Sequence, residues 1–261
     1  CCSHLNAEEI NNRKVTALEV FDTATEKSLL FEATPDIVSQ WTALRYPLQG
    51  IFITHAHIGH YAGLMFLGHE SAATKSLNVF AMPRMEKFLR NNGPWSQLVD
   101  YKNIEIFPLA DQILVELSGG IKVKPYQVPH RDEFSETVAF EIKSSKKSVL
   151  FLPDIDSWSE WESEYGHSLQ ERVAAVDLAF LDATFFDNNE LPGRDMSEIP
   201  HPRMVETMEV FDNLPETEKN KVYFIHLNHT NPARFFTSSA YKNISERGYK
   251  IANSNDSFCL D

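Results

Sequence analysis

The sequence predicts a mixed α/β fold with two mixed β-sheets packed face to face and helices outside. Many short apolar runs bounded by turn signals alternate with a smaller number of segments that have helical spacing. Several predicted strands end in a histidine or an aspartate, as in layered α/β folds whose functional groups gather at strand ends. No Ser/Gly-rich linker, low-complexity tract or repeat divides the 261 residues. We therefore expect one domain over residues 1–261.

Turn signals define the elements of the first half. Residues 22–27 separate two apolar runs and predict a hairpin, and Thr34-Pro35-Asp36 predicts a helix start. Asn91-Asn92-Gly93-Pro94 predicts a helix end, and Ser118-Gly119-Gly120 predicts a hairpin turn. We expect strands at 15–21, 28–33, 49–54, 78–82, 104–107, 112–117 and 121–128, and helices at 37–44, 61–68 and 83–91.

The second half continues the pattern with a hairpin whose second strand runs into Pro153-Asp154. Cys259 is expected to be a small buried residue in the last strand. We expect strands at 137–143, 148–152, 176–181, 221–225, 249–252 and 257–260, and helices at 157–162, 169–174, 202–213 and once more after residue 232.

Three histidines, His55, His57 and His60, directly follow an apolar run of β type. Side chains two positions apart on a strand point to the same face, so His55 and His57 can both reach one ion as the strand ends. Gly59 is expected to permit a sharp turn, after which His60 faces the same cavity from the start of the next helix. Neutral imidazole is the commonest metal ligand in proteins, and the motif therefore predicts a metal site.

Other strand ends supply further candidates, namely His130, Asp154, Asp182 and His226. We expect them to converge on the same place. Asp156 is an alternative to Asp154, disfavoured because the strand would have to continue past Pro153.

Several polar residues have two interpretations. Asp36 is either a carboxylate at a helix start or a partner behind a metal-bound histidine. Asp132 and Glu133 either orient His130 or contact substrate, or they are solvated loop charges. His201 either lines the cavity or lies in an exposed turn. Surface positions are expected for His4, His69 and His167.

The formal net charge of −13 argues against a broad phosphate-binding surface, so nucleic acid is not an expected partner. A small-molecule or peptide-derived substrate fits better. No apolar run reaches the roughly 18 residues that a membrane span needs. No GxSxG elbow and no phosphate-binding glycine loop occurs. The composition does not set the oligomeric state.

The three cysteines form no disulfide framework. A chain that begins Cys1-Cys2 has two interpretations. It is a processed lipoprotein, which would place it in the bacterial cell envelope, or it carries the remnant of a longer cysteine segment, for which the bacterial cytoplasm is expected.

With these residues in view, the chain resembles the metallo-β-lactamase superfamily. The superfamily signature HxHxDH corresponds to residues 55–60, with Gly59 in place of the aspartate. The resemblance matches His130 to the next histidine, Asp154 to the bridging aspartate and His226 to the last histidine. It implies an αββα four-layer sandwich, with two mixed β-sheets flanked by helices and a metal site at one edge.

A closer resemblance is to the pyrroloquinoline quinone (PQQ) biosynthesis protein B family. His229 departs from it, because it occupies an Asn position of the biosynthetic proteins, and the leading glycine-rich strand of the family is missing. The shared strings are Thr54-His55-Ala56-His57-Ile58-Gly59-His60-Tyr61, Ala33-Thr34-Pro35-Asp36-Ile37, Pro129-His130-Arg131-Asp132-Glu133, Leu152-Pro153-Asp154, Asp182-Ala183-Thr184-Phe185, and His226 with Thr230-Asn231-Pro232.

The resemblance implies one or two divalent metal ions. One ion would take His55, His57 and His130. Because Gly59 removes a carboxylate, the ligands of the other reduce to His60, His226 and Asp154. Two histidines and one carboxylate are the ligand set of non-haem Fe(II) oxygenases, and they also suit zinc or manganese.

The same ligands are compatible with three functions. The PQQ family implies an iron-dependent hydroxylase of a tyrosine-derived precursor. The wider superfamily implies a zinc-dependent hydrolase of an ester, amide or phosphodiester. The loss of the carboxylate at Gly59 motivates a third function, a non-catalytic metal-binding carrier.

The catalytic candidates are Asp154, Asp182 and His229. Asp182 is interpreted as a structural carboxylate or one behind a ligand, because Asp154 already fills the bridging position. For His229 three roles stay open: it replaces His226 as a ligand, acts as a general acid, or caps a turn.

Overall fold

The computed structural model describes residues 14–254 and 256–260, and the chain divides into two units. The N-terminal unit comprises residues 15–127 and 131–140. The C-terminal unit comprises residue 14, residues 128–130 and the described residues from 141 onward. Strand β8 (Val138–Lys143) begins in the first unit and ends in the second. The predictions for Cys1, Cys2 and His4 lie outside the described residues.

The N-terminal unit is built on a five-stranded sheet of order β1-β2-β3-β4-β5. Strands β1 and β2 form the predicted antiparallel hairpin, whereas the pairs β2–β3, β3–β4 and β4–β5 are parallel, so the sheet is mixed. A short antiparallel pair, β6 and β7, also belongs to this unit. The strands are β1 Leu18–Asp22, β2 Lys27–Phe31, β3 Leu48–Phe52, β4 Leu77–Ala81, β5 Ile104–Pro108, β6 Val115–Glu116 and β7 Lys122–Gln127.

Phenylalanines in register hold the parallel strands of this sheet together. Phe31, Phe52 and Phe80 are partners on adjacent strands, and their rings stack at centroid distances of 4.8 and 4.3 Å. A one-residue slip would move each ring to the opposite face, so the stack fixes the register. It thereby fixes the position at which β3 ends and from which the chain continues to His55.

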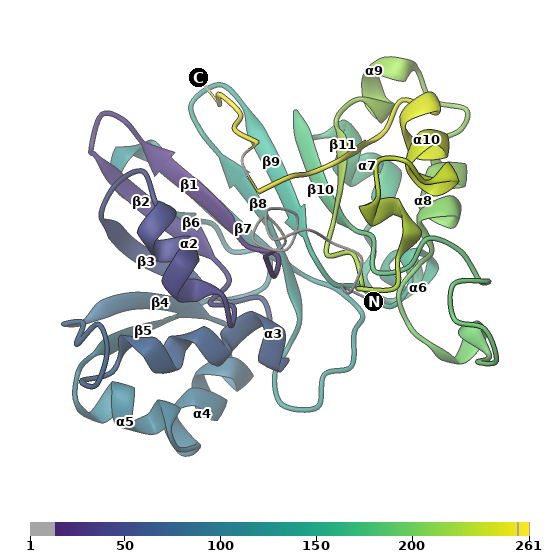
Figure 1. The fold of residues 1–261 in the computed structure, drawn as a ribbon. Coiled ribbons are helices and arrows are strands. Elements are labelled where there is room, and N and C mark those ends of the chain that lie inside the picture. Colours follow the sequence, from purple (N-terminus) through teal and green to yellow (C-terminus); the bar gives the residue numbers. More distant parts are fainter. Residues whose placement is uncertain (1–13, 255, 261) are drawn as a thin grey trace. The chain divides into compact units, whose positions relative to one another are not determined.

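Helices of this unit pack on the sheet through an apolar core that includes Ile51, Val79, Leu64 and Met85. Figure 1 shows α4 and α5 side by side along β4 and β5. The helices are α2 Ile37–Ala43, α3 Ile58–Tyr61, α4 Pro83–Asn91 and α5 Trp95–Asp100, with 3₁₀ turns η1 Ala62–Leu67 and η2 Ser118–Gly120.

The C-terminal unit contains four strands that are parallel to their neighbours, in the order β12-β11-β10-β9. Strands β9, β10 and β11 are almost continuously apolar and mostly buried, as expected for parallel strands covered on both faces. Their carboxyl ends lie at one edge. The strands are β9 Ser148–Leu152, β10 Leu178–Asp182, β11 Val222–Ile225 and β12 Lys250–Ile251.

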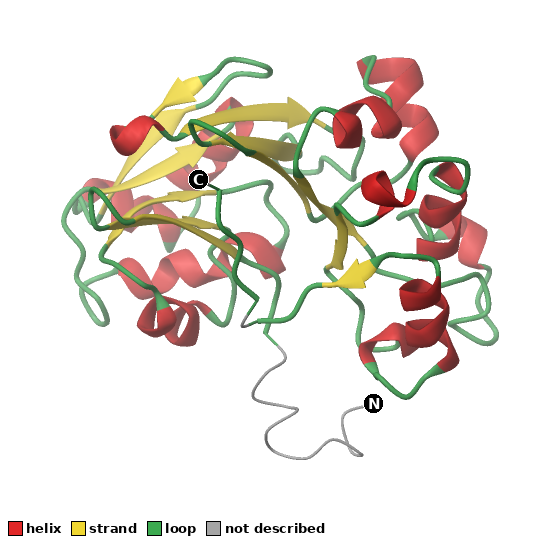
Figure 2. Ribbon diagram, turned by 90° about the horizontal axis from the view of Figure 1, so that it is seen from above, coloured by secondary structure: helices red, strands yellow, loops and turns green. Residues whose placement is uncertain are grey.

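Helices flank these strands, as the ribbon coloured by secondary structure shows (Figure 2). Trp161, Val173, Met208 and Ile244 are their fully buried anchors. The helices are α6 Trp158–Tyr165, α7 Leu169–Ala174, α8 Met204–Val210, α9 Glu216–Lys219 and α10 Ser239–Glu246, with 3₁₀ turns η3 Met196–Glu198 and η4 Pro232–Arg234.

The predicted elements are largely confirmed, with corrections at some ends. The helix expected at 61–68 starts at Ile58 and continues as 3₁₀ turns. The run 112–117 contributes only the two-residue β6. Helix α5 was not predicted, because Asn-Gly-Pro ends α4 and Pro94 at once begins the next helix. The short helix α9 was also missed.

The last predicted strand, at 257–260, is wrong, and so is the burial of Cys259, which is exposed. Side chains hold this segment in place of a backbone ladder. Lys147 donates to the carbonyl of Cys259, and Ser144 donates to that of Leu260. A segment held by such side-chain contacts has no need of the alternating buried and exposed residues that mark a strand in a sequence.

Tyr249 links β12 to α8, because its hydroxyl donates to the carbonyl of Met208 at 3.0 Å. Burial raises the pKa of Tyr249 from 10.0 to about 12. The raised pKa of the folded state contributes stability that is fully present below pH 10 and lost as the pH rises through about 12. We expect urea unfolding to show that Tyr249→Phe lowers stability below pH 10 and that the difference from wild type shrinks towards pH 12. A difference that stays constant with pH would contradict this.

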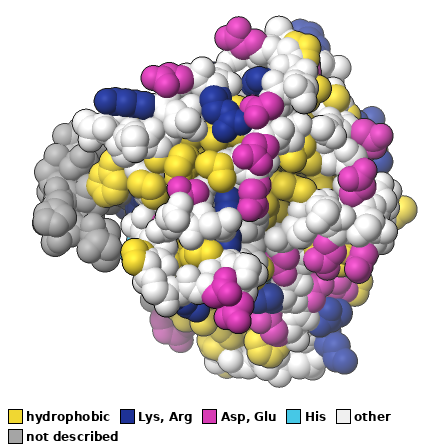
Figure 3. Space-filling view, turned by 90° about the vertical axis from the view of Figure 1, so that its right-hand side faces the viewer, with side chains coloured by type: hydrophobic (Ala, Val, Ile, Leu, Met, Phe, Trp, Pro, Cys, Tyr) yellow, Lys and Arg dark blue, Asp and Glu magenta, His cyan; other side chains and the backbone are white. Residues whose placement is uncertain are grey.

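None of the described helices is long and apolar enough to cross a membrane. On the face in Figure 3, Lys and Arg side chains are interspersed with Asp, Glu and uncharged residues. They do not gather into one field on that face.

Candidate metal centre

The histidine cluster, His55, His57 and His60, lies just beyond the carboxyl end of β3. The strand ends at Phe52, three residues before His55, and His57 precedes the first turn of α3. The backbone N–H of Ala56 donates to Ser135 Oγ at 2.8 Å, which anchors the segment. His55 and His60 are buried, with ring centroids 4.2 Å apart. The three histidines therefore meet as predicted, although β3 ends earlier than expected and His55 and His57 lie in the loop that follows it.

A buried carboxylate sets the tautomer of His55. Thr54 Oγ1 donates to Glu32 Oε1 at 2.5 Å, so its lone pair accepts the N–H of His55 Nδ1 at 2.8 Å. A neutral imidazole carries one N–H, which leaves the lone pair on Nε2. Glu32 Oε1 also lies 3.5 Å from Nδ1 of His60.

The other side of the cluster is held by Glu133. Its Oε2 accepts the N–H of His57 Nε2 at 2.9 Å, which leaves the lone pair of His57 on Nδ1. That hydrogen bond is the main reason that the pKa of Glu133 is lowered from its usual value. His57 Nδ1 and His55 Nε2 are 3.0 Å apart. When both rings are neutral, their lone pairs face one another, an arrangement that a shared cation would stabilise.

The distance fits a metal ion. Two histidine nitrogens bound to one tetrahedral zinc lie about 3.3 Å apart, given Zn–N bonds of about 2.0–2.1 Å. His55 and His57 therefore form a chelating pair whose other nitrogens already have partners. Such partners behind metal-bound histidines orient the rings and raise their basicity.

The carboxylate cluster, Asp154, Asp182, His201 and His226, lies at the carboxyl ends of β9, β10 and β11. Asp182 ends β10, and His226 directly follows β11. Parallel pairing in register brings these ends together, because Asp182 pairs with Ile225. One ligand atom each of Asp154, Asp182 and His201 lies within 4.8 Å of the others.

A threonine sets the tautomer of His226 as Thr54 does for His55. Thr184 Oγ1 donates to Asp182 Oδ1 at 2.7 Å, so it accepts the N–H of His226 Nδ1 at 3.0 Å. The lone pair of Nε2 then faces Asp154 Oδ2 at 3.4 Å. This is again a pair of acceptors that a cation would bridge. His226 adopts a positive φ of 62°, a backbone conformation that is unusual for residues other than glycine.

Asp182 is a fully buried acceptor. It accepts hydrogen bonds from the N–H groups of Ile155 and Thr184 and from His201 Nδ1, the last at 2.7 Å. Burial lowers the pKa of His201, but Asp182 and Asp154 outweigh it and leave that pKa above 6.5. Asp182 therefore orients His201, and the side chain of His201 lies in the cluster with only 9% exposed.

His130 is oriented by Asp156, which was expected only as an alternative to Asp154. Asp156 Oδ1 accepts from His130 Nδ1 at 2.6 Å, and the N–H of Asp156 donates to the carbonyl of Pro129. This leaves Nε2 of His130 as the nitrogen with the ligand lone pair. Asp156 thus orients the ring of His130.

Three expected residues have other partners. Asp36 Oδ2 accepts from the N–H of Val15 at 2.8 Å and makes no side-chain bond to α2, so it does not cap that helix. Asp132 Oδ1 accepts from Thr137 Oγ1 at 2.8 Å in a loop. His229 is exposed, with Nδ1 3.0 Å from Asn228 Oδ1, and no contact in the described chain joins it to Asp154.

The turn predicted at Gly59 is also wrong. Gly59 lies inside α3, and its φ is not among the positive values of the described glycines. A Cβ there would have no neighbour within 4 Å. The conformation therefore does not require glycine at this position.

Glu32 was not among the residues expected at the site, and a bond to His57 was not among the roles left open for Glu133, which were to orient His130, to contact substrate or to be a solvated loop charge. Glu32 is fully buried at the end of β2, with a positive φ of 85°. A charged residue that interrupts the apolar run Leu29-Leu30-Phe31 was the available signal. For Glu133 no local signal exists, because its partner His57 lies 76 positions earlier.

Glu133→Gln is expected to lower the affinity of the chain for zinc by about 10–100-fold. The neutral amide holds the N–H of His57 less strongly and can turn its own N–H towards the ring. Competition with a chromophoric chelator measures the change. Glu105→Gln, at an exposed position of β5, is the matched control. Equal effects of the two substitutions would contradict the role of Glu133.

The sequence that builds this site matches a known protein family. The model of the family described as "Beta-lactamase superfamily domain" matches residues 27–227. The chain belongs to the metallo-β-lactamase superfamily. The matched range includes both clusters and ends one residue after His226.

Curated relatives within the superfamily are named coenzyme PQQ synthesis protein B. The protein of Methylococcus capsulatus is 25% identical over 292 residues, covering 96% of this chain and 90% of the relative. That of Rhizobium meliloti is 25% identical over 260 residues, covering 87% and 79%. The predicted resemblance to the PQQ biosynthesis protein B family is confirmed.

Solved structures confirm the metallo-β-lactamase fold, a mixed α/β architecture of sheets and helices. Zn(2+)-bound PqqB from Methylobacterium extorquens matches with a TM-score of 0.74 at 20% identity, covering 92% of this chain and 85% of that one. A diphosphatase from the PhnP family matches with a TM-score of 0.65 at 18% identity, covering 95% and 84%. At these identities the likeness concerns the fold.

Proposed function

We propose that this member of the superfamily is a metal-dependent enzyme of PQQ biosynthesis, an iron-dependent hydroxylase of a tyrosine-derived precursor. Metal dependence is supported by two close pairs of potential ligand atoms, His55 Nε2 with His57 Nδ1 and His226 Nε2 with Asp154 Oδ2. The similarity to PQQ synthesis proteins B supports the pathway. Histidine with a carboxylate is a donor set that suits Fe(II), and a bound iron would supply redox chemistry towards O₂.

The protein's own part would be to hold the ligands and manage protons. Thr54, Thr184 and Asp156 fix three histidine tautomers before any ion binds. His201, held by Asp182, is the group beside Asp154 that is able to donate or accept a proton.

A zinc-dependent hydrolase is the second candidate. The shared fold with a diphosphatase from the PhnP family supports it, and the 3.0 Å separation of His55 Nε2 and His57 Nδ1 is short enough for both atoms to bind one zinc ion. Zinc would supply an activated water and polarise the scissile group. A non-catalytic carrier is the third candidate, and turnover of any model substrate that His57→Ala abolishes would exclude it.

Metal content and oxygen uptake test the proposal. The protein is purified anaerobically without added metal, analysed for metals, reconstituted with iron and given a tyrosine-containing precursor. Iron bound in proportion to protein, with oxygen consumption that depends on the precursor, is the expected result. Bound zinc and no oxygen uptake under any metal loading would overturn the hydroxylase and favour the hydrolase.

A further inference from the structure

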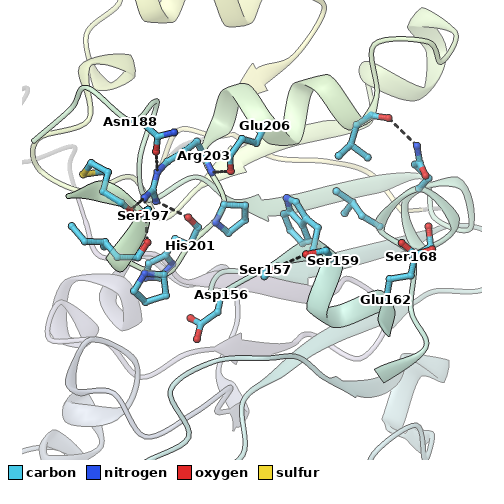
Figure 4. A pocket seen from close by; sticks show the side chains of 18 residues that line it. Asp156, Ser157, Ser159, Glu162, Ser168, Asn188, Ser197, His201, Arg203 and Glu206 are labelled. Carbon is cyan, nitrogen blue, oxygen red and sulfur yellow. Dashed lines mark hydrogen bonds between the residues drawn. The ribbon is translucent and has the colours of Figure 1, made fainter. Parts of the chain in front are cut away.

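A pocket of about 610 Å³ opens in the C-terminal unit among α6, the start of α7, the 188–203 loop and α8. This volume is typical of small-molecule sites. Figure 4 shows Asp156 and His201 towards one end and Glu162 and Ser168 towards the other. Because His201 hydrogen-bonds Asp182, one end of the pocket adjoins the carboxylate cluster.

The charges that line the pocket favour a cation. Carboxylates come from Asp156, which accepts from His130, from Glu206, which accepts from the backbone N–H of Arg203, and from Glu162. Arg203 is the only Lys or Arg among the described residues of the lining, and its guanidinium is occupied. It donates to Asn188 Oδ1 at 2.9 Å, to the carbonyl of His201 at 2.6 Å, and to those of Met196 and Ile199. The lining therefore carries three carboxylates and one guanidinium, a balance that favours a cationic ligand over an anionic one.

Trp158 adds a second feature that suits a cation. Its indole N–H donates to Thr207 Oγ1 at 2.9 Å, which fixes the ring in the pocket wall. Tryptophan is the strongest aromatic partner for ammonium groups. Glu162 lies one helical turn after Trp158 on α6, so an ammonium between them would contact both an aromatic face and a carboxylate.

We propose that this pocket binds an organic ammonium ion, a substrate whose amine lies at Trp158 and Glu162 while its other end approaches His201. The claim that the substrate reacts at the end near His201 rests on the proposed function. The inference extends that function because it assigns an amine to the substrate. Leu169, Ile199 and Pro200 supply the apolar wall for its hydrocarbon body.

Tyramine and tyrosol test the charge requirement, because they differ only in an ammonium group in place of a hydroxyl. Calorimetric titration of the full chain, both chelator-treated and zinc-loaded, measures both affinities. We expect tyramine to bind at least about threefold more tightly, and Glu162→Gln to weaken tyramine about threefold without changing tyrosol. Glu164→Gln, an exposed residue of α6 outside the pocket lining, should change neither.

Other outcomes overturn the inference. These are tyrosol binding as tightly as tyramine, no binding of tyramine, or the same loss in the Glu162→Gln and Glu164→Gln proteins. Trp158→Leu, with its fold checked by circular dichroism, should weaken tyramine more than tyrosol. The chelator-treated arm separates the two proposals. A chain that binds tyramine but no metal refutes the proposed function alone, and one that binds zinc but no tyramine refutes the pocket alone.

Discussion

Replacing His57 with alanine is expected to lower the affinity of the chain for zinc or Fe(II) by more than about a hundredfold, beyond the loss typical of removing an outer partner. The substitution removes Nδ1, the atom that faces His55 Nε2 at 3.0 Å. It also leaves Glu133 without the ring N–H that it accepts. Chelator competition and elemental analysis measure affinity and metal per chain, and any metal-dependent turnover should fall with them.

The fold should survive this substitution, since the His57 side chain is 25% exposed and only one turn of helix begins there. His69→Ala is the matched control. His69 is exposed, and its ring packs beside Tyr101. Unchanged metal content in the His57→Ala protein, or an equal loss in the His69→Ala protein, would show that the histidine cluster does not hold the ion.

The positions of the ligand candidates could be predicted because they stand at strand ends. Apolar runs identify β9, β10 and β11, and the first polar residues after them are Asp154, Asp182 and His226. Parallel strands in register bring such residues together whatever the loops do. The same logic applied to β3 gave the histidine cluster, although the strand ended earlier than expected.

The partners of these ligands could not be predicted in the same way. Glu133 reaches His57, and Asp156 reaches His130, across 76 and 26 positions of sequence. Neither choice follows from local pattern, since Asp132 stands beside Glu133 and Asp154 stands near Asp156. Which carboxylate turns towards a ring depends on how loops pack, and a single sequence carries no signal for that.

Burial of polar residues was the other limit. From the sequence a buried and an exposed His201 were equally expected, and His229 was a catalytic candidate for which the roles of ligand, general acid and turn cap stayed open. The 188–203 loop decides the first, because Arg203 binds its carbonyls and turns His201, at a φ of 87°, towards Asp182. The turn after β11 decides the second, because the side chain of Asn231 donates to Ala183 O and the turn leaves His229 exposed.

Replacing Asp182 with alanine is expected to destabilise the metal-free chain by about 3–5 kcal/mol, because the buried groups that donate to its carboxylate would lose their charged acceptor. Asp182 is fully buried. It accepts from Thr184 N–H at 2.8 Å, from Thr184 Oγ1 at 2.7 Å, from Ile155 N–H at 3.1 Å and from His201 Nδ1 at 2.7 Å. Urea unfolding of wild-type and variant proteins, both treated with chelator, measures the difference.

Asp195 provides a matched control for this substitution, because it makes the same local pair of hydrogen bonds. It accepts from Ser197 N–H at 2.9 Å and from Ser197 Oγ at 2.6 Å, but it is exposed. Water replaces those bonds in the Asp195→Ala protein, so little change in stability is expected. Equal losses in the two proteins would mean that the turn, and not the buried carboxylate, carries the energy. A much larger loss for Asp182→Ala would mean that this carboxylate stabilises the loops that carry Thr184 and His201 before any metal binds.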